Sequence, residues 1–496
     1  MTPPKAPHIV PVQPRWMLPL ASPGGGFDFN DPLPPDFTEV SVHDPSVFKS
    51  GEYFYIIGSH MAMARSKDLI AWEQIATYVQ PDNPLIDPND FADAFSWSQS
   101  NTFWAGDIQP MPGKRTADGR FLLYYCNCEG SKPLGDIGLA VADSPTGIYK
   151  NQGMFLKSGM EGISEDGTPY DATIHPNCID PHCFFDNDGV YWMLYGSFSG
   201  GIFIMRMDPE TGLPLPGQGY GKKLTGGNHA RIEGPYMLYS PETQYYYLFL
   251  SFGGLGPTEG YNIRVARSRS VDGPFLDARG QDMINAKGAE GSMFDDRSIE
   301  PFGTKLMGGY WFMQEQGEPG RNTTGHLSPG HNSALFCPDT GRYFLIFHQR
   351  FAHARRIHQV RVHEMFLTED GWFAVSPFRY DGGTRRTFEA AHVVGSWKLI
   401  NHGQDINYTC TQSETVNFQA DGTIHGRGVK GSWSLDADDQ LIHIVIDNMG
   451  NCDFTRQYSG KLLRCHNADA GKWVMAFTAM SHDGIALWGA GLADGK

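Results

Sequence analysis

Aromatic and aliphatic residues recur in short runs separated by polar turns over the first three quarters of the chain. Five units share one order, in which a turn precedes an aromatic-rich strand and a second strand with small residues. The aromatic runs are E-Y-F-Y-I-I-G, R-F-L-L-Y-Y-C, V-Y-W-M-L-Y, Q-Y-Y-Y-L-F-L-S-F and R-Y-F-L-I-F-H. Turns of the D-G and N-D-G type favour antiparallel hairpins, because their twist matches that of the flanking strands. The repetition predicts a five-bladed β-propeller, with a β-sandwich of similar hairpins as the alternative.

The pattern changes near residue 385. The runs G-S-W-K-L-I, T-V-N-F-Q-A-D-G-T-I-H-G and G-S-W-S-L-D read as short alternating strands, and their Trp residues suit a small core. We therefore predict an all-β chain with two domains. Residues 30–385 would form the propeller, and residues 390–496 a small C-terminal antiparallel β-barrel or sandwich.

Composition narrows the classes of partner. The 496 residues include 40% hydrophobic and 19% charged residues, which is typical of a globular protein. The formal net charge of −16 argues against nucleic acid, because a phosphate backbone requires a basic face, whereas a neutral polysaccharide is compatible. No apolar run reaches the roughly 20 residues that span a bilayer, so no membrane partner is expected. We expect a monomer.

The N-terminal sequence and the cysteines indicate whether the protein is secreted or stays inside the cell. The start, M-T-P-P-K-A-P-H-I-V-P-V, lacks the apolar core of a secretory signal. We expect a secreted protein whose signal peptide is absent from this chain, with an intracellular protein as the alternative. The eight Cys form no C-x-x-C pair, which favours buried thiols, although a disulfide among Cys410, Cys452 and Cys465 stays open.

Three acids occupy the same local setting. Asp44 lies in V-H-D-P-S-V, Asp180 in C-I-D-P-H-C-F-F and Glu233 in R-I-E-G-P-Y-M-L, each where an apolar strand begins. The innermost strands of a propeller line its central channel, so equivalent positions should converge there. Asp-Pro can also mark a simple turn. Convergent carboxylates predict cleavage of a glycosidic bond.

Over nearly its whole length the chain resembles the arabinan-degrading enzymes of glycoside hydrolase family 43, particularly those with an extra C-terminal β domain. The motifs of Asp180 and Glu233 belong to the block in which the resemblance is strongest. The block runs from I-D-P-H-C-F-F-D-N-D-G-V-Y-W-M-L-Y to R-I-E-G-P-Y-M-L-Y-S-P-E-T-Q-Y-Y-Y-L-F-L-S-F. The resemblance implies an inverting endo-1,5-α-L-arabinanase acting on arabinan. It assigns Asp44 as general base, Glu233 as general acid, and Asp180 as the residue that orients the acid and tunes its pKa.

The assignment agrees with the chemistry of inversion, which needs a base that activates water and an acid that protonates the leaving oxygen. An anionic Asp180 would make the ionisation of Glu233 costly and keep it protonated. A fourth acid, Asp107 in F-W-A-G-D-I-Q-P-M, is a further candidate, with a structural hydrogen-bonding role as the alternative.

His348, in L-I-F-H-Q-R, is the metal candidate. The resemblance implies that it anchors one calcium ion on the propeller axis, held mostly by water because calcium prefers oxygen ligands. A lone His is otherwise more often a polar lining residue. His353, His358 and His363 follow at intervals of five, which alternate the faces of a strand, so we interpret them as incidental.

Substrate contacts are predicted from residues close to the acids. Trp104 could stack on a furanose ring or fill the core, and His43 and Asn177 could bind hydroxyl groups. The alternatives within this chemistry are an exo-acting arabinanase, an arabinofuranosidase or a β-xylosidase. The alternative from another class is a carbohydrate-binding propeller without catalysis.

Overall fold

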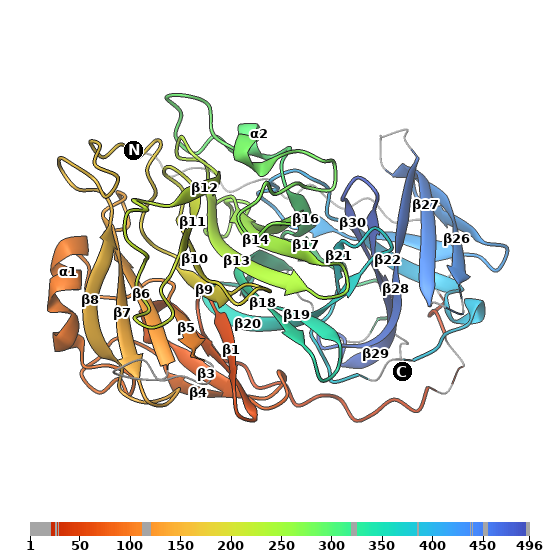
Figure 1. Cartoon of the computed structure of the whole chain (residues 1–496). Helices are drawn as coiled ribbons and strands as arrows, with labels where there is room; N and C mark the ends of the chain where they lie inside the picture. The colour runs from red at the N-terminus through yellow and green to blue at the C-terminus, as the bar shows by residue number, and fades with distance from the viewer. Residues whose placement is uncertain are drawn as a thin grey trace, which may run out of the picture.

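The computed structural model describes residues 21–24, 27, 29–111, 121–318, 325–383, 386–436, 438, 440–449 and 455–492. Its strands form a ring of five sheets beside a closed barrel, drawn in blue in Figure 1. The all-β prediction of a five-bladed propeller followed by a small β-barrel is therefore confirmed.

Each blade is an antiparallel sheet with four successive strands. The strands, from the channel outward, are β1 (Ser46–Ser50), β2 (Tyr53–Ile57), β3 (Met63–Ser66), β4 (Trp72–Ala76); β5 (Asp107–Pro110), β6 (Phe121–Cys128), β7 (Gly135–Ala142), β8 (Lys150–Lys157); β9 (His182–Phe185), β10 (Tyr191–Tyr195), β11 (Ile202–Arg206), β12 (Lys222–Thr225); β13 (Ile232–Ser240), β14 (Tyr245–Phe252), β15 (Asn262–Ser268), β16 (Thr304–Met307); and β18 (His326–Cys337), β19 (Arg342–Phe351), β20 (Ala354–Leu367), β21 (Phe373–Val375). The five inner strands contact one another in order, and β18 closes the ring against β1.

The aromatic second strands explain why the blades stack. Tyr191, Met193 and Tyr195 of β10 pack into the core shared with blade two. Trp192 and Leu194 point the other way, into the core shared with blade four. Side chains of a strand alternate between faces, so an apolar run without polar interruptions buries both faces of the sheet. Burial of apolar surface on both faces is the main force that holds neighbouring blades together.

The C-terminal barrel consists of β22 (Gly395–Asn401), β24 (Glu414–Phe418), β25 (Thr423–Gly426), β26 (Val429–Asp436), β27 (Leu441–Met449), β28 (Arg456–Asn467), β29 (Lys472–Ser481) and β30 (Ala486–Gly491). Its core contains Trp397, Phe418 and Phe477, whose rings lie 5.2 to 6.1 Å apart. A closed barrel leaves no unpaired edge strand.

The two parts share structure across their junction. Strand β23 (Thr411–Gln412), which follows β22 in sequence, leaves the barrel and pairs in parallel with β17 (Tyr310–Trp311) of blade five. Trp488 of β30 belongs to the core between blades four and five. Asp31, near the N-terminus, pairs with Arg464 of the barrel at 2.6 Å. The domain limits 30–385 and 390–496 stay a prediction.

Helix is scarce in the described residues. The structure has two short α-helices, α1 (Ala92–Ser98) and α2 (Asp296–Ile299), and the 3₁₀ turns Ser59–Met61, Pro88–Phe91, Met283–Asn285 and Ala390–His392. No helix among these residues is long and apolar enough to cross a membrane. Cys465 is a free thiol, the Cys410 thiol donates to the His326 carbonyl at 3.4 Å, and Cys452 lies outside the described residues.

Candidate active site

The three acids reach the channel from blades one, three and four. Asp44 and Asp180 stand two residues before the inner strands β1 and β9, and Glu233 is the second residue of β13. Asp44 and Asp180 share a left-handed backbone with φ of +57° in each. A residue with a side chain adopts this conformation at a cost, and such residues cluster at functional sites. The repeated D-P motif therefore marks the same local geometry in two blades.

The Asp44 carboxylate is buried among donors. Ser59 Oγ donates to Oδ2 at 2.5 Å, and His43 Nδ1 lies 3.2 Å from the same oxygen. His331 Nδ1 and His348 Nδ1 lie 3.2 and 3.3 Å from Oδ1. Burial by itself would raise the pKa of Asp44, but the contacts with the three histidines hold it well below its usual value. Asp44 is therefore ionised at neutral pH.

Asp180 is buried, and the charge of the half-buried Glu233 acts on it. Ser197 Oγ and Tyr261 Oη each donate to Glu233 at 2.8 Å, and the Gly234 N–H donates to Asp180 Oδ2 at 3.3 Å. Burial raises the pKa of Glu233, and it raises that of Asp180 to about 8, with the charges of Glu233 and Asp44 adding to the shift. Two carboxylates that interact strongly cannot both ionise readily. The raised pKa values favour a protonated Glu233, and the roles of Asp180 and Glu233 stay a prediction.

The fifth blade contributes His331, which the sequence reasoning missed. His331 is the sixth of the twelve residues of the inner strand β18, and its Nδ1 lies 3.2 Å from Asp44 Oδ1. Burial would lower its pKa, but the charges of Asp44, Asp180 and Glu233 outweigh burial and raise it. Gly234 has φ +57°, and a Cβ there would lie 3.1 Å from the His331 ring. The Gly that follows Glu233 therefore lets the ring approach the acids.

Asp107 has a structural role. Its Oδ1 accepts from Ser46 Oγ at 2.5 Å, and its Oδ2 accepts from the Cys183 N–H at 2.7 Å. These two bonds join the inner strands of blades one, two and three. Asp107 therefore has the structural hydrogen-bonding role that was the alternative, and it is not one of the groups that act in the chemistry.

The predicted sugar contacts occupy different environments. His43 lies beside Asp44. Asn177 is 8% exposed, and its Oδ1 accepts from Ser158 Oγ at 3.1 Å. Trp104 is half-buried and packs against the core between blades two and three. Substrate binding by these three side chains stays a prediction.

His348 lies in a cluster of imidazoles. It is fully buried on β19, and candidate ligand atoms of His43, His348 and His358 all lie within 4.8 Å of one another. His358, which we interpreted as incidental, shares a face with His348, because Val360 opposite His348 is two residues away on β20. His363 turns elsewhere, with Nδ1 2.7 Å from the Ser376 carbonyl.

The expected calcium ion would take most of its ligands from water. Calcium prefers six to eight oxygen ligands. The side-chain atoms that converge at His348 are ring nitrogens, and the oxygens of Asp44 are already engaged with Ser59 and histidines. The described side chains near His348 do not provide a set of free oxygen ligands. An axial calcium ion therefore stays a prediction.

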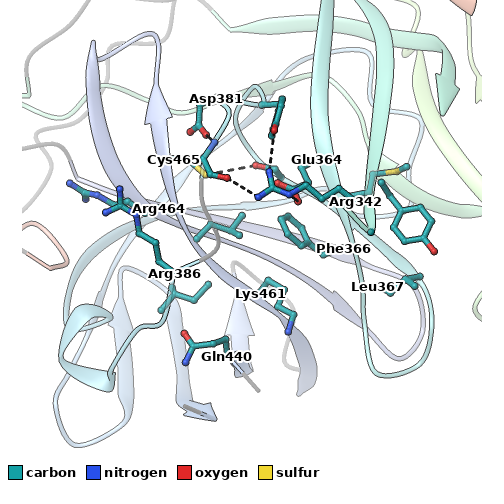
Figure 2. A pocket seen from close by; sticks show the side chains of 18 of the residues that line it. Arg342, Glu364, Phe366, Leu367, Asp381, Arg386, Gln440, Lys461, Arg464 and Cys465 are labelled. Atoms are coloured by element: carbon teal, nitrogen blue, oxygen red, sulfur yellow. Dashed lines mark hydrogen bonds and ion pairs between the residues drawn. The ribbon is translucent and has the colours of Figure 1, made fainter. Parts of the chain in front are cut away.

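A cavity of about 470 Å³ lies away from the three acids, between blade five and the barrel (Figure 2). Its lining includes Arg342 and Glu364, 3.6 Å apart, with Asp381 and Arg464 close by. Arg464 is already paired with Asp31. Because none of the acids that converge on the channel lines it, this cavity is a junction between the two parts of the chain.

Buried carboxyl groups with opposed pKa shifts at the mouth of a five-bladed propeller define the class of glycoside hydrolases. The chain belongs to glycosyl hydrolases family 43, whose model matches residues 37–373, and a C-terminal lipocalin-like domain model matches residues 377–489.

Named relatives match over nearly the full chain. The extracellular endo-α-(1→5)-L-arabinanase 2 of Bacillus subtilis is 50% identical over 92% of this chain and 94% of its own length. The corresponding enzyme of Thermotoga petrophila is 44% identical over 92% and 94%. Its crystal structure has a TM-score of 0.85 at 42% identity, covering 92% of this chain and all of that one. A family 43 structure from Bacillus licheniformis has a TM-score of 0.86 at 48% identity, covering 92% and 99%.

Proposed function

We propose that this chain is a secreted, inverting endo-1,5-α-L-arabinanase that cleaves internal α-1,5-L-arabinofuranosidic linkages of arabinan. The proposal rests on the convergence of Asp44, Asp180 and Glu233 on the inner strands of the propeller and on the opposed directions of their pKa shifts. Histidines hold Asp44 ionised, whereas burial keeps a proton on the pair of Asp180 and Glu233. Inversion requires one ionised and one protonated carboxyl group. Two relatives at 50% and 44% identity are named as extracellular endo-arabinanases. Their names support arabinan as the substrate, cleavage of internal linkages and secretion.

The proposed reaction is a single displacement. Glu233 gives its proton to the glycosidic oxygen as the bond to the anomeric carbon breaks. Asp44 removes a proton from the water that attacks that carbon on the opposite face. Asp180 orients Glu233 and tunes its pKa, and His331 offsets the negative charge that remains between the acids. Exchange of protons with solvent then restores the starting state.

The geometry predicts how the pH profile changes in Tyr261→Phe. Activity requires Asp44 ionised and Glu233 protonated, so the alkaline limb reports loss of the proton from the acid pair. The Tyr261 hydroxyl donates to Glu233 at 2.8 Å and lowers the pKa of Glu233. Its removal raises that pKa, so we expect the alkaline limb of kcat/KM to move to higher pH while the acid limb stays in place.

Tyr195→Phe is the matched control for that profile. The Tyr195 hydroxyl is also buried, but it donates to the Tyr220 carbonyl at 2.7 Å, away from the three acids. We expect this variant to keep the wild-type limbs. An alkaline limb that is unchanged or moves to lower pH in Tyr261→Phe would remove Glu233 as the group that sets it.

The function is tested by the products released from linear, debranched arabinan at low conversion. We expect a broad set of arabino-oligosaccharides and a rapid fall in viscosity, because internal bonds are cut at random. Release of a single short product from the first turnover would indicate exo action. Equal or greater activity on β-1,4-xylan would reject arabinan as the substrate.

A further inference from the structure

A loop of blade four presents two exposed apolar side chains near the proposed acid. Residues 269–303 join β15 to β16, and α2, at the top of Figure 1, lies within this loop. Met293 and Phe294, just before α2, are 61% and 49% exposed. A single exposed apolar residue is common, but neighbouring ones cost free energy and often mark a place where a ligand binds. Their surroundings decide between these two cases.

The ring of Phe294 meets that of Phe198, which belongs to blade three. The two centroids are 5.7 Å apart in a T-shaped contact, and Phe198 is half-buried. Both residues have a left-handed backbone, with φ of +58° at Phe294 and +49° at Phe198. A residue with a side chain adopts this conformation at a cost, and such residues cluster at functional sites. The two rings form one aromatic platform that is carried by two blades.

Phe198 connects the aromatic platform to Glu233. The Phe198 N–H donates to the Ile232 carbonyl at 2.9 Å, and the hydroxyl of its neighbour Ser197 donates to Glu233 Oε2 at 2.8 Å. Ile232 is buried in the core between blades three and four. Because side chains alternate along a strand, Glu233 points away from that core. The aromatic platform therefore lies directly beside the acid.

An ion pair fixes the loop that carries Phe294. Arg231, two residues before Glu233, pairs with Asp296 of α2, and its Nε lies 2.9 Å from Oδ1. The Arg231 guanidinium also lies 6.0 Å from the centre of the Phe294 ring. Tyr408, from the segment between β22 and β23, donates to Asp296 Oδ2 at 2.8 Å. A surface held by such contacts keeps its shape without a ligand, which lowers the entropy cost of binding.

The position of the acid determines which part of the substrate reaches the aromatic platform. In the proposed reaction Glu233 protonates the leaving oxygen, while Asp44 acts on the opposite face of the cleaved sugar. The sugars joined to the leaving oxygen therefore extend past Glu233. Sugar rings have flat apolar faces that pack well on aromatic rings. Arg231, the cation beside these rings, is paired with Asp296, so the surface suits a neutral chain.

We propose that Phe198 and Phe294, with Met293 at the edge, bind the sugars on the leaving side of the cleaved bond. A chain that extends past Glu233 reaches Phe198 first, so Phe294 holds the second of these sugars. The inference rests on the proposed arabinanase function and deepens it. Such a site favours bonds that have at least two sugars on the leaving side, and it thereby contributes to the choice of internal bonds.

The distribution of cleaved bonds tests the proposal. Arabinohexaose labelled with heavy oxygen at its reducing end is hydrolysed to low conversion, and mass spectrometry of the products gives the share of cleavage at each bond. Phe294→Ala should lower cleavage of bonds with two or more leaving sugars by about three- to tenfold, relative to the bond with one, the usual contribution of an aromatic contact. This ratio between bonds does not depend on the amount of active enzyme.

Phe294→Tyr and Phe27→Ala are the matched controls. The Tyr variant keeps the aromatic ring and should keep the wild-type distribution. Phe27 is 44% exposed, and its ring centroid lies 4.3 Å from that of His392, which precedes the barrel strand β22. Its loss should leave the distribution unchanged. Melting temperatures show whether each variant is folded.

Three results would overturn the proposal. They are a wild-type distribution in Phe294→Ala, an equal change in Phe27→Ala, and a change in Phe294→Tyr as large as that in Phe294→Ala. If Phe294→Ala does not fold, Phe294→Leu gives the same comparison, because leucine keeps apolar bulk without the ring. Each of these results leaves the proposed arabinanase activity intact. Failure of the wild type to cleave arabinohexaose would instead reject the proposed function, and this inference with it.

Discussion

Glu233→Gln is expected to lower kcat on arabinan by about 10²- to 10⁴-fold, the usual contribution of a general acid. The amide is nearly the same size and keeps contact with Tyr261 and Ser197, but it has no proton to give to the leaving oxygen. The protein should stay folded, as judged by its melting temperature. Glu73→Gln, on the outer strand of blade one, is the control and should keep wild-type activity.

The leaving group distinguishes loss of the proton donor from general damage. An arabino-oligosaccharide with a nitrophenyl leaving group needs little protonation, so Glu233→Gln should retain a much larger share of activity on it than on arabinan. Equal losses on the two substrates would show that Glu233 does not act as the acid. Retention of more than about a tenth of wild-type turnover on arabinan would contradict the assignment outright.

Asp44→Ala is expected to reduce turnover by a similar 10²- to 10⁴-fold, because the attacking water loses its base. Ser59 and three histidines surround this carboxylate and hold it ionised at the channel. The truncated side chain leaves space for a small anion. Azide should therefore restore part of the activity and yield an arabinosyl azide of inverted configuration.

Asp208→Ala is the matched control for Asp44, because Asp208 also precedes a Pro. Its carboxylate only caps a turn, accepting from the Glu210 N–H at 2.9 Å and from Thr211 Oγ1 at 3.1 Å. This variant should keep full activity and show no response to azide. Rescue of Asp44→Ala with retained configuration, or full activity without azide, would be incompatible with a general base.

The propeller could be predicted because its strands are strongly marked. The aromatic runs E-Y-F-Y-I-I-G, V-Y-W-M-L-Y and Q-Y-Y-Y-L-F-L-S-F contain the strands β2, β10 and β14 in full. Aromatic runs between polar turns have few other stable arrangements. In contrast, β23 is two residues long, and its pairing with β17 depends on tertiary contacts that no local pattern encodes.

The acids of the site could be predicted because they recur at similar places in successive blades. Contacts that depend on the register between paired strands could not be predicted. Asp44, Asp180 and Glu233 were found because equivalent positions in repeated blades converge. His331 was missed because it is not an acid and lies in the middle of the inner strand of blade five, away from the start of the strand. The approach of His358 to His348 follows from the pairing of β19 with β20, which sequence spacing alone does not give.

Stereochemistry tests the central claim most directly. Proton NMR during early hydrolysis of linear α-1,5-arabinan can follow the anomeric signal of the newly formed reducing ends. A base at Asp44 that activates water opposite the acid at Glu233 predicts β-configured ends first, with the α form appearing later by mutarotation. Initial formation of α-configured ends would mean a retaining mechanism and would contradict the roles proposed for both residues.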